Sequence, residues 1–233
     1  HRDLHSFPTR RSSDLYAVNY YQSLKEKIKK ESEYKALIRE AELQALKSQI
    51  NPHFLFNSLN SISSLTVSNP EKAQEMVINL SNFMRYSLMH NEKEMVAFSR
   101  ELDNIKLYLS IEKVRFGRKL NAEFEIDVHC MDAEIPNMIL QPLFENAIKY
   151  GVYETTDQVT IKTTCNCEGS ILRITIANDY DSATLKRKGE GIGLQNIRKR
   201  MEIIYNSPEL VKVTDNKTSF EVQLIIPQKQ AVS

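Results

Sequence analysis

The spacing of apolar residues predicts helices through the first half of the chain. Residues 21–50 contain no Gly or Pro and are rich in Glu, Lys, Ala and Leu, which is typical of a long helix. Leu43, Leu46 and Ile50 are separated by three and four residues, the spacing of one seam of a coiled coil. Pro52 interrupts this helix, because proline lacks a backbone donor and clashes with the preceding turn. We therefore expect either a kink or a new helix start there.

Two further amphipathic runs, at 54–65 and 76–88, predict a helical hairpin. The turn signal Ser68-Asn69-Pro70 separates them, so the two helices are expected to be antiparallel. Such a hairpin buries too little surface by itself, and we expect a second copy to complete a dimeric four-helix bundle. Another helix is expected at 99–116.

After Gly117 the apolar residues alternate with polar ones, and this period of two is typical of strands. Helices are expected at 136–150, ended by Gly151, and again after Gly193. Strands are expected at 120–128, 159–164, 171–177, 209–214 and 219–226. The fold class is therefore predicted to be α+β.

These patterns divide the chain into four expected segments. Residues 1–15 combine Arg, Ser and Pro without periodicity, and we expect a non-native leader. Residues 16–50 are expected to form a juxtamembrane and coiled-coil helix. An aromatic patch at 15–21 precedes basic residues, as at the cytoplasmic end of a membrane helix, although the start of an amphipathic helix explains it equally well. A helical domain at 51–117 and a mixed domain at 118–228 follow.

Composition limits the class of protein. The chain has 233 residues, 41% hydrophobic and 26% charged, which is typical of a soluble globular protein. Its net charge of +1 gives no global argument for nucleic-acid binding, and we expect none. No apolar stretch approaches the length of a membrane span. The three cysteines lack zinc-ligand spacing and fit a reducing cytoplasm.

His53 is the first candidate for chemistry. A lone histidine on a helix is more often solvated than reactive, but the break at Pro52 favours a position at a surface. A neutral imidazole has a ring nitrogen whose lone pair is able to attack phosphorus. Asn57, one helical turn further on, is placed to hydrogen-bond the ring and fix its tautomer.

Glu145, Asn146 and Lys149 form the second candidate group. They place a carboxylate, a carboxamide and an ammonium group on neighbouring positions of one expected helix. A carboxamide oxygen is a hard ligand that suits Mg²⁺, and a lysine meets phosphate as a point charge. The alternative is an ordinary amphipathic helix with a solvated polar face.

A glycine-rich segment and a strand end complete the set. Alternating glycines before a helix let backbone amides approach a polyphosphate, although glycine turns are common and the pattern alone is weak. Asn178 and Asp179 end a predicted strand, where turn chemistry explains them as well as ligand binding does. The glycine-rich segment consists of Gly189, Gly191 and Gly193, followed by Leu194.

Taken in this order, the motifs resemble the LytS-like branch of bacterial sensor histidine kinases. LKSQINPHFLFNSLNSI resembles the phosphoacceptor box, and YLSIEKVRF (108–116) resembles the linking helix. ILQPLFENAIKYG resembles the N box of the ATPase fold shared with gyrase, the Hsp90 chaperones and MutL, and GEGIGLQNIRKRM resembles the G2 box. The resemblance covers roughly residues 40–227.

The resemblance implies a dimeric helical bundle followed by a GHKL (Bergerat-type) α/β-sandwich domain that uses ATP and Mg²⁺. It implies that His53 accepts the phosphoryl group, that Asn146 binds Mg²⁺, and that Glu145 acts as base or orients water. Lys149 would contact phosphate, and the glycines at 189–193 would border the nucleotide lid. The expected partner is a response regulator of LytTR type, at the cytoplasmic side of the inner membrane, with attachment through a missing upstream region.

Two departures from the family pattern affect the chemistry. Asn178-Asp179-Tyr180 stands where the fold usually has Asp-Asn-Gly, so Asn178 would accept from the adenine amino group without a charge, or Asp179 would replace it after a small shift. Phe54, not an acid, follows His53, so the general base is unassigned.

Two rival functions belong to other classes. A degenerate kinase that dimerises as a scaffold without turnover is favoured by Asn178. Another enzyme of the same ATPase fold, an ATP-hydrolysing machine or an anti-sigma-factor serine kinase, is disfavoured by the His53 box and its helical hairpin.

Overall fold

The computed structural model describes residues 20–31, 51–89, 94–179, 191–216 and 218–228. The chain consists of two units, residues 1–51 and 52–233. In the first, residues 20–31 form a helix that is exposed along its whole length. The expected leader and the expected seam of Leu43, Leu46 and Ile50 lie outside the described residues. No helix within the described ranges is long and apolar enough to cross a membrane.

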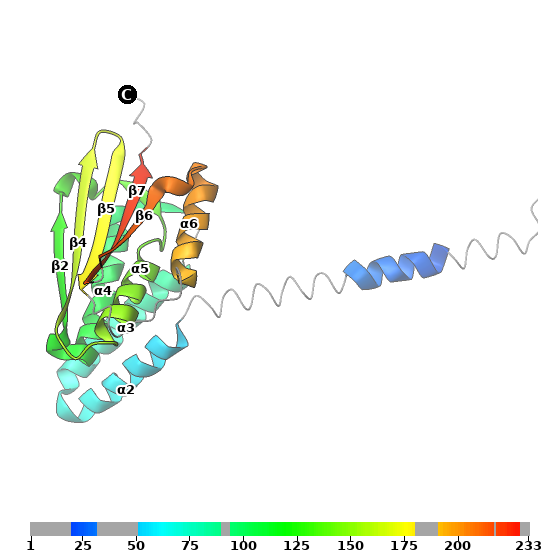
Figure 1. Ribbon diagram of the computed structural model, residues 1–233. Helices are drawn as coiled ribbons and strands as arrows, with labels where there is room; N and C mark the ends of the chain where they lie inside the picture. The colour runs from blue at the N-terminus through cyan, green and yellow to red at the C-terminus, as the bar shows by residue number, and fades with distance from the viewer. Residues whose placement is uncertain (1–19, 32–50, 90–93, 180–190, 217, 229–233) are drawn as a thin grey trace, which may run out of the picture. The chain divides into compact units, whose positions relative to one another are not determined.

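The predicted hairpin is present at the start of the second unit. It consists of helix α2 (Pro52–Ser68) and helix α3 (Pro70–Met89), shown in cyan in Figure 1. Each helix begins at a proline, whose missing N–H costs nothing in the first turn. Asn69 caps α3, because its Oδ1 accepts a hydrogen bond of 3.1 Å from the backbone N–H of Lys72.

One face of the hairpin packs on helix α4 (Phe98–Phe116) of the same chain. Three rings meet there, Phe54 from α2, Phe83 from α3 and Tyr108 from α4, with centroids 5.1–5.7 Å apart. Such separations are typical of attractive aromatic pairs. The hairpin therefore packs on a helix of its own chain. A second copy of the chain would have to pair with the faces of the hairpin that α4 leaves uncovered.

A five-stranded sheet forms the other half of this unit. Its order is β2-β4-β5-β7-β6, with β2 parallel to β4 and the remaining pairs antiparallel. Each strand comes close to its predicted place, although β6 starts later than expected because Pro208–Leu210 form a short 3₁₀ turn. The strands are β2 (Leu120–Ile126), β4 (Val159–Glu168), β5 (Ile171–Asp179), β6 (Val211–Asp215) and β7 (Ser219–Pro227).

The helix expected at 136–150 begins later than predicted. Pro136 ends strand β3 (Glu134–Pro136), which pairs antiparallel with β1 (Met95–Ala97) in a small second sheet. Helix α5 runs over Gln141–Ala147 and continues as a π-helical turn, Ile148–Val152. Gly151 lies inside that turn and does not end the helix as expected. The pairing of β1 with β3 is a tertiary contact, so the local pattern does not contain it.

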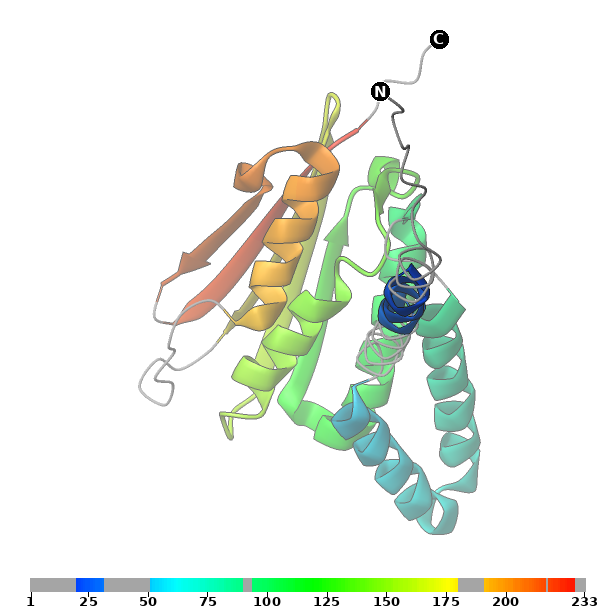
Figure 2. The same ribbon diagram turned by 90° about the vertical axis from the view of Figure 1, so that its right-hand side faces the viewer.

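Helix α6 (Ile192–Tyr205) follows the glycine-rich segment as predicted and ends at Asn206, which has a left-handed conformation with φ 53°. Figures 1 and 2 show α5 and α6 on the same face of the sheet, so this half is a two-layer α/β sandwich. The N-terminal end of α6 and the C-terminal end of β5 lie at the same end of the sandwich. The overall class is α+β, as the sequence predicted.

A single hydrophobic core connects the helices with the sheet. It contains Phe83 from the hairpin, Leu109 from α4, Phe144 from α5 and Val222 from β7. The change of pattern near residue 118 therefore marks the passage from α4 to β2 inside one compact unit. A functional division between parts at 51–117 and 118–228 stays a prediction.

Candidate functional site

Two of the predicted motifs touch at Gly193, in the first turn of α6. A Cβ atom placed on Gly193 would lie 3.2 Å from Nδ2 of Asn146 and 3.7 Å from Cβ of Pro142. A side chain at position 193 would push against Asn146, so glycine favours this close approach of α6 to α5. Asn146, which is partly exposed, therefore lies beside the N-terminus of α6.

A third motif joins them at Gly151. A Cβ atom on Gly151 would lie 3.0 Å from Nδ2 of Asn178 and 3.4 Å from the carbonyl oxygen of Asp179. The π-helical turn after α5 therefore contacts the end of β5. Residues 146–151, 178–179 and 193 are distant along the chain, and the fold brings them to one end of the sandwich.

The N-terminus of α6 has the properties of an anion-binding site. The carbonyl oxygen of Gly191 accepts from the backbone N–H of Leu194 at 3.0 Å and of Gln195 at 3.3 Å, which closes the first turn. The backbone N–H groups of the two residues before Leu194 point along the helix axis, at the positive end of the helix dipole. Phosphate groups bind at such termini. The predicted site residue Leu194 is 4% exposed and belongs to the core, and Gly189 lies outside the described residues.

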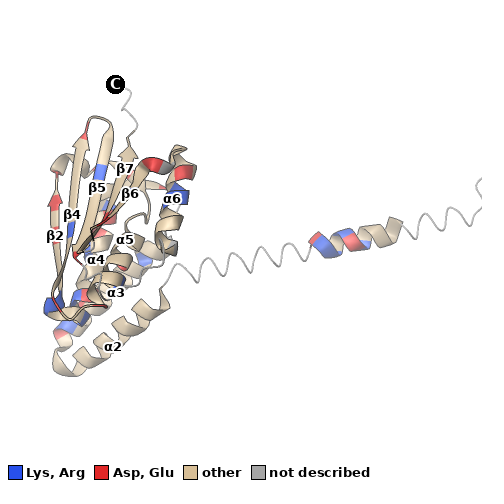
Figure 3. Cartoon of the chain, in the orientation of Figure 1, with Lys and Arg blue, Asp and Glu red and all other residues tan. Residues whose placement is uncertain are grey.

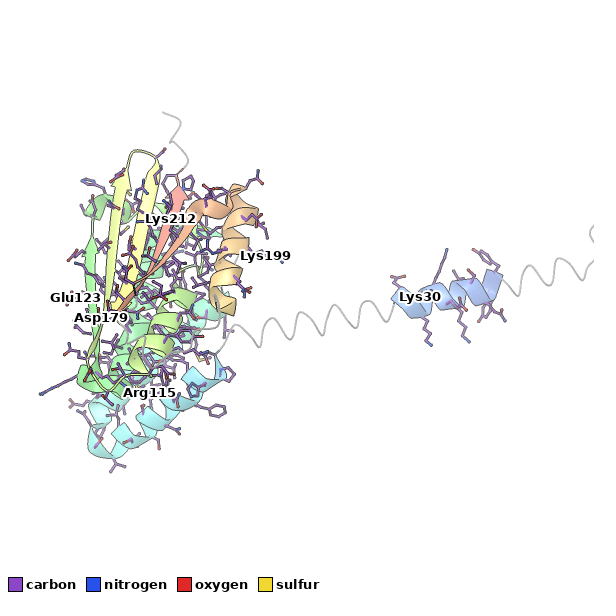
Figure 4. The ribbon with its side chains drawn as sticks, viewed as in Figure 1. Lys30, Arg115, Glu123, Asp179, Lys199 and Lys212 are labelled. Atoms are coloured by element: carbon purple, nitrogen blue, oxygen red, sulfur yellow. The ribbon has the colours of Figure 1, made fainter. Side chains whose placement is uncertain are left out.

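Asn178 and Asp179 lie on opposite faces of β5. Asn178 is 3% exposed, and its Nδ2 donates a hydrogen bond of 3.1 Å to the carbonyl oxygen of Asp179. Its other polar atom, Oδ1, is an acceptor. Asp179 is exposed at the strand end (Figure 4). A shift of one residue along the strand would exchange the two faces, so the alternation favours Asn178 as the buried acceptor.

Glu145 and Lys149 occupy different surroundings. Glu145 accepts a hydrogen bond of 2.9 Å from Nε2 of Gln141, and burial raises the pKa of its carboxyl. Lys149 is exposed, with Nζ 5.1 Å from the centre of the Tyr150 ring. Both side chains come from the segment that carries Asn146, as predicted.

His53 is exposed at the second residue of α2, and its ring lies against Tyr153. The ring centroids are 6.0 Å apart, with 35° between the planes. Tyr153 directly follows the π-helical turn, and its backbone N–H donates to the carbonyl oxygen of Ile148 at 3.0 Å. The segment that carries Asn146 thus ends in the ring that contacts His53.

The side-chain amide nitrogen of Asn57 does not donate a hydrogen bond to the His53 ring. Nδ2 of Asn57 is buried and makes no hydrogen bond to any residue that the structure describes. The carbonyl oxygen of Asn57 accepts from Oγ of Ser61 at 3.0 Å. The expected donation from this amide to the imidazole is therefore not seen.

Two residues of this region escaped the sequence analysis. Tyr153 was missed because it lies two residues beyond Gly151, where the helix was expected to end. Glu112 of α4 is 4% exposed, and burial raises the pKa of its carboxyl to about 7, with Glu145 raising it further and Arg115 opposing the shift. No pattern in the chain marks Glu112 as an unusual acid.

The residues at this end of the sandwich offer groups of the kind that bind a nucleoside triphosphate. The Asn146 carboxamide lies directly against the first turn of α6, whose N-terminal amides are the kind of group that binds phosphate. Within the described ranges, no group of three or more His, Cys, Asp and Glu side chains is placed to hold a metal ion. Mg²⁺ in nucleotide sites is bound mainly by phosphates and water, with few protein ligands.

Comparison with known proteins agrees with this arrangement. Residues 41–120 match the family described as histidine kinase. Sensor histidine kinase YpdA of Escherichia coli is 33% identical over 214 residues, which cover 87% of this chain and 37% of that protein. Sensor protein LytS of Oceanobacillus iheyensis is 32% identical over 209 residues, which cover 84% and 36%. Sensor histidine kinase YesM of Bacillus subtilis is 31% identical over 205 residues, which cover 86% and 36%.

Among solved structures, Acinetobacter baumannii histidine kinase AdeS has 14% identity and a TM-score of 0.44, covering 81% of this chain and 95% of that one. The helical hairpin and α4 lie within residues 41–120, the part of the chain that matches the histidine kinase family. The chain belongs to the LytS-like sensor histidine kinase family. It spans little more than a third of the length of the curated relatives that it matches.

Proposed function

We propose that this chain is the catalytic part of a sensor histidine kinase, which transfers the γ-phosphoryl group of ATP to His53. The convergence of Asn146, Asn178 and the start of α6 at one end of the sandwich carries this proposal. His53 of the same chain contacts the segment that contains Asn146, through Tyr153.

In the proposed reaction, a ring nitrogen of neutral His53 attacks the γ-phosphorus of ATP. The new N–P bond forms as the bond between the γ-phosphorus and the bridging oxygen breaks, and ADP leaves with that oxygen. The phosphorylated ring then loses its extra proton to solvent or to a base that is not assigned. Catalysis of such a transfer consists mainly of positioning and of charge neutralisation.

Each residue at the sandwich end has a proposed role in binding. The amides at the start of α6 hold phosphate oxygens, and the exposed Lys149 ammonium adds a positive charge. Asn146 supplies a carboxamide ligand to Mg²⁺, which neutralises phosphate charge when it is bound. Oδ1 of Asn178 accepts from the adenine amino group.

Autophosphorylation tests the proposal directly. The protein is incubated with γ-labelled ATP and Mg²⁺ beside His53→Ala, and acid-labile, alkali-stable label is counted. We expect label on the wild type and none on the variant. Equal acid-labile label on both proteins would refute His53 as the acceptor. Calorimetry with Mg-ATP on the same two proteins shows whether the binding site is intact.

We propose that the protein acts as a dimer. Although one face of the hairpin packs on α4, both of its helices keep exposed apolar side chains, and α2 contains no charged residue (Figure 3). Exposed apolar faces of this kind favour pairing with a second copy. The exposed side chains are Phe56, Leu59 and Val67 on α2, and Val77, Ile78 and Leu88 on α3.

The proposed phosphohistidine passes its phosphoryl group to an aspartate of a response regulator. From the resemblance of the motifs to the LytS-like family, we propose a regulator of LytTR type and a place at the cytoplasmic side of the inner membrane. Phosphotransfer to a purified LytTR regulator and to a regulator of another class distinguishes the two partners.

A scaffold without turnover is the second candidate function. Asn178, in the position of the usual charged acceptor, supports it, because a neutral acceptor binds the adenine amino group less strongly. Binding of Mg-ATP without acid-labile label on His53 would favour the scaffold over the kinase.

A further inference from the structure

Tyr153 stands between the phosphoacceptor helix and the end of α4. Its ring is 6.0 Å from the His53 ring and 5.1 Å from the Phe116 ring, centroid to centroid, and it meets Phe116 edge-on at 80°. Both separations lie in the range of attractive aromatic contacts. One side chain therefore touches α2, which carries His53, and α4.

Arg115 holds the Tyr153 ring in place. Its guanidinium carbon lies 4.6 Å from the centre of the Tyr153 ring and 4.8 Å from that of Phe116, and its Nη1 donates a hydrogen bond to Oη of Tyr153. Glu112, one turn earlier on α4, lies 3.8 Å from the same Nη1. A planar guanidinium that stacks on a ring and also bonds its hydroxyl fixes both the tilt and the rotation of that ring.

The backbone fixes the other end of this side chain. Tyr153 follows the π-helical turn directly and is bonded to it through its own N–H. Short π-helical turns frequently occur at functional sites. The position of the Tyr153 ring is thus tied to the segment that carries Asn146 and Lys149.

We infer that Tyr153 is a positioning residue for His53, oriented by Arg115, and that it sets the place of the acceptor ring relative to the nucleotide segment. This inference rests on the proposed function. Because phosphoryl transfer depends on the alignment of acceptor and donor, loss of the Tyr153 ring slows transfer and leaves nucleotide binding unchanged.

Three variants test the inference in the full chain. At saturating Mg-ATP, we expect Tyr153→Ala to lower the rate of His53 labelling by roughly 10–100-fold, as displacement of a reacting group does. The Kd of the variant for Mg-ATP is expected to stay within about twofold of the wild-type Kd. A loss of 1.4 kcal/mol in binding free energy would raise the Kd about tenfold. Tyr153→Phe retains the aromatic ring, and we expect it to retain most of the wild-type rate of His53 labelling. Tyr21→Ala, an exposed tyrosine in the other unit, is the matched control.

A merely structural role would lower ATP affinity together with the rate, and that result would overturn the inference. So would a Tyr153→Ala protein that is labelled at the wild-type rate or faster, or a Tyr153→Phe protein as slow as Tyr153→Ala.

A second measurement does not depend on kinase activity. The NMR signal of the His53 ring proton is recorded in the wild type and in Tyr153→Ala, since an adjacent aromatic ring shifts it. We expect the signal to move in the variant, and an unmoved signal would overturn the inference. If the signal moves but the wild type takes no label on His53, the proposed function fails and the contact stands.

Discussion

The side-chain amide of Asn146 lies so close to Gly193 that a Cβ atom at position 193 would be 3.2 Å from its Nδ2. The proposed Mg²⁺ ligand and the start of the proposed phosphate-binding helix are therefore in direct contact. This contact makes the site sensitive to the smallest added side chain.

Gly193→Ala is expected to weaken Mg-ATP binding about tenfold, a cost of about 1.4 kcal/mol, because the added methyl group displaces the Asn146 amide. Isothermal calorimetry measures the change. Ile203→Ala, on the exposed side of the same helix, serves as control and is expected to bind as the wild type does. Wild-type affinity in Gly193→Ala would contradict the close approach.

Gly151→Ala is expected to disturb the adenine end of the site. The added Cβ would lie 3.0 Å from Nδ2 of Asn178 and 3.2 Å from Cγ1 of Val159, so the buried amide has to move. Overpacking of this kind costs about 1–3 kcal/mol of stability. Thermal unfolding and ATP titration measure the two effects, with Val128→Ala, at a 71% exposed position, as control. A protein of unchanged stability and affinity would rule out the contact.

Glu112 is expected to make stability depend on pH. Burial raises its pKa from the ordinary 4.5 to about 7, so the folded protein keeps a proton that the unfolded chain releases between these values. The stability associated with Glu112 is complete below pH 4.5 and is lost as the pH rises to about 7. Relative to Glu112→Gln, which does not titrate, the wild type is expected to lose about 3 kcal/mol across this window. Denaturant unfolding at several pH values measures the difference, and parallel curves for the two proteins would contradict it.

Tyr86→Phe is expected to destabilise the connection between the hairpin and α5. The Tyr86 hydroxyl of α3 lies 2.7 Å from Oε1 of Glu101 and 2.9 Å from Oδ1 of Asn137. The Glu101 carboxylate also accepts the backbone N–H of Met138 at 2.7 Å, just before α5. Loss of a hydrogen bond that leaves a buried polar group without its partner costs about 1–3 kcal/mol. Urea unfolding tests this, and a loss below about 0.5 kcal/mol would show that the hydroxyl is dispensable.

Leu59→Glu is expected to weaken the proposed dimer. Leu59 is 48% exposed on the uncharged helix α2, and a buried carboxylate at a helix interface costs more than the roughly 1.5–3 kcal/mol of lost apolar burial. Sedimentation or light scattering measures the dimer dissociation constant, which should rise at least about tenfold. Glu94→Gln, outside the hairpin, is the control. An unchanged dimer would move the interface away from this face.

The sequence by itself determined where most of the helices and strands lie, because a period of three to four or of two is a local property of the chain. It also determined which motifs are present, and the structure brings the Asn146 side chain beside Gly193. Helices α2, α3, α4 and α6 begin within a few residues of their predicted places.

Only the tertiary structure decided how these pieces meet. The pairing of β1 with β3 moved the start of α5 past Pro136, and the alternation of β5 buried Asn178 while leaving Asp179 exposed. The packing of the hairpin on α4 placed His53 against Tyr153. These contacts join residues that are far apart along the chain. The local spacing of apolar residues shows which face of a helix or strand is buried, but not which distant part of the chain covers it.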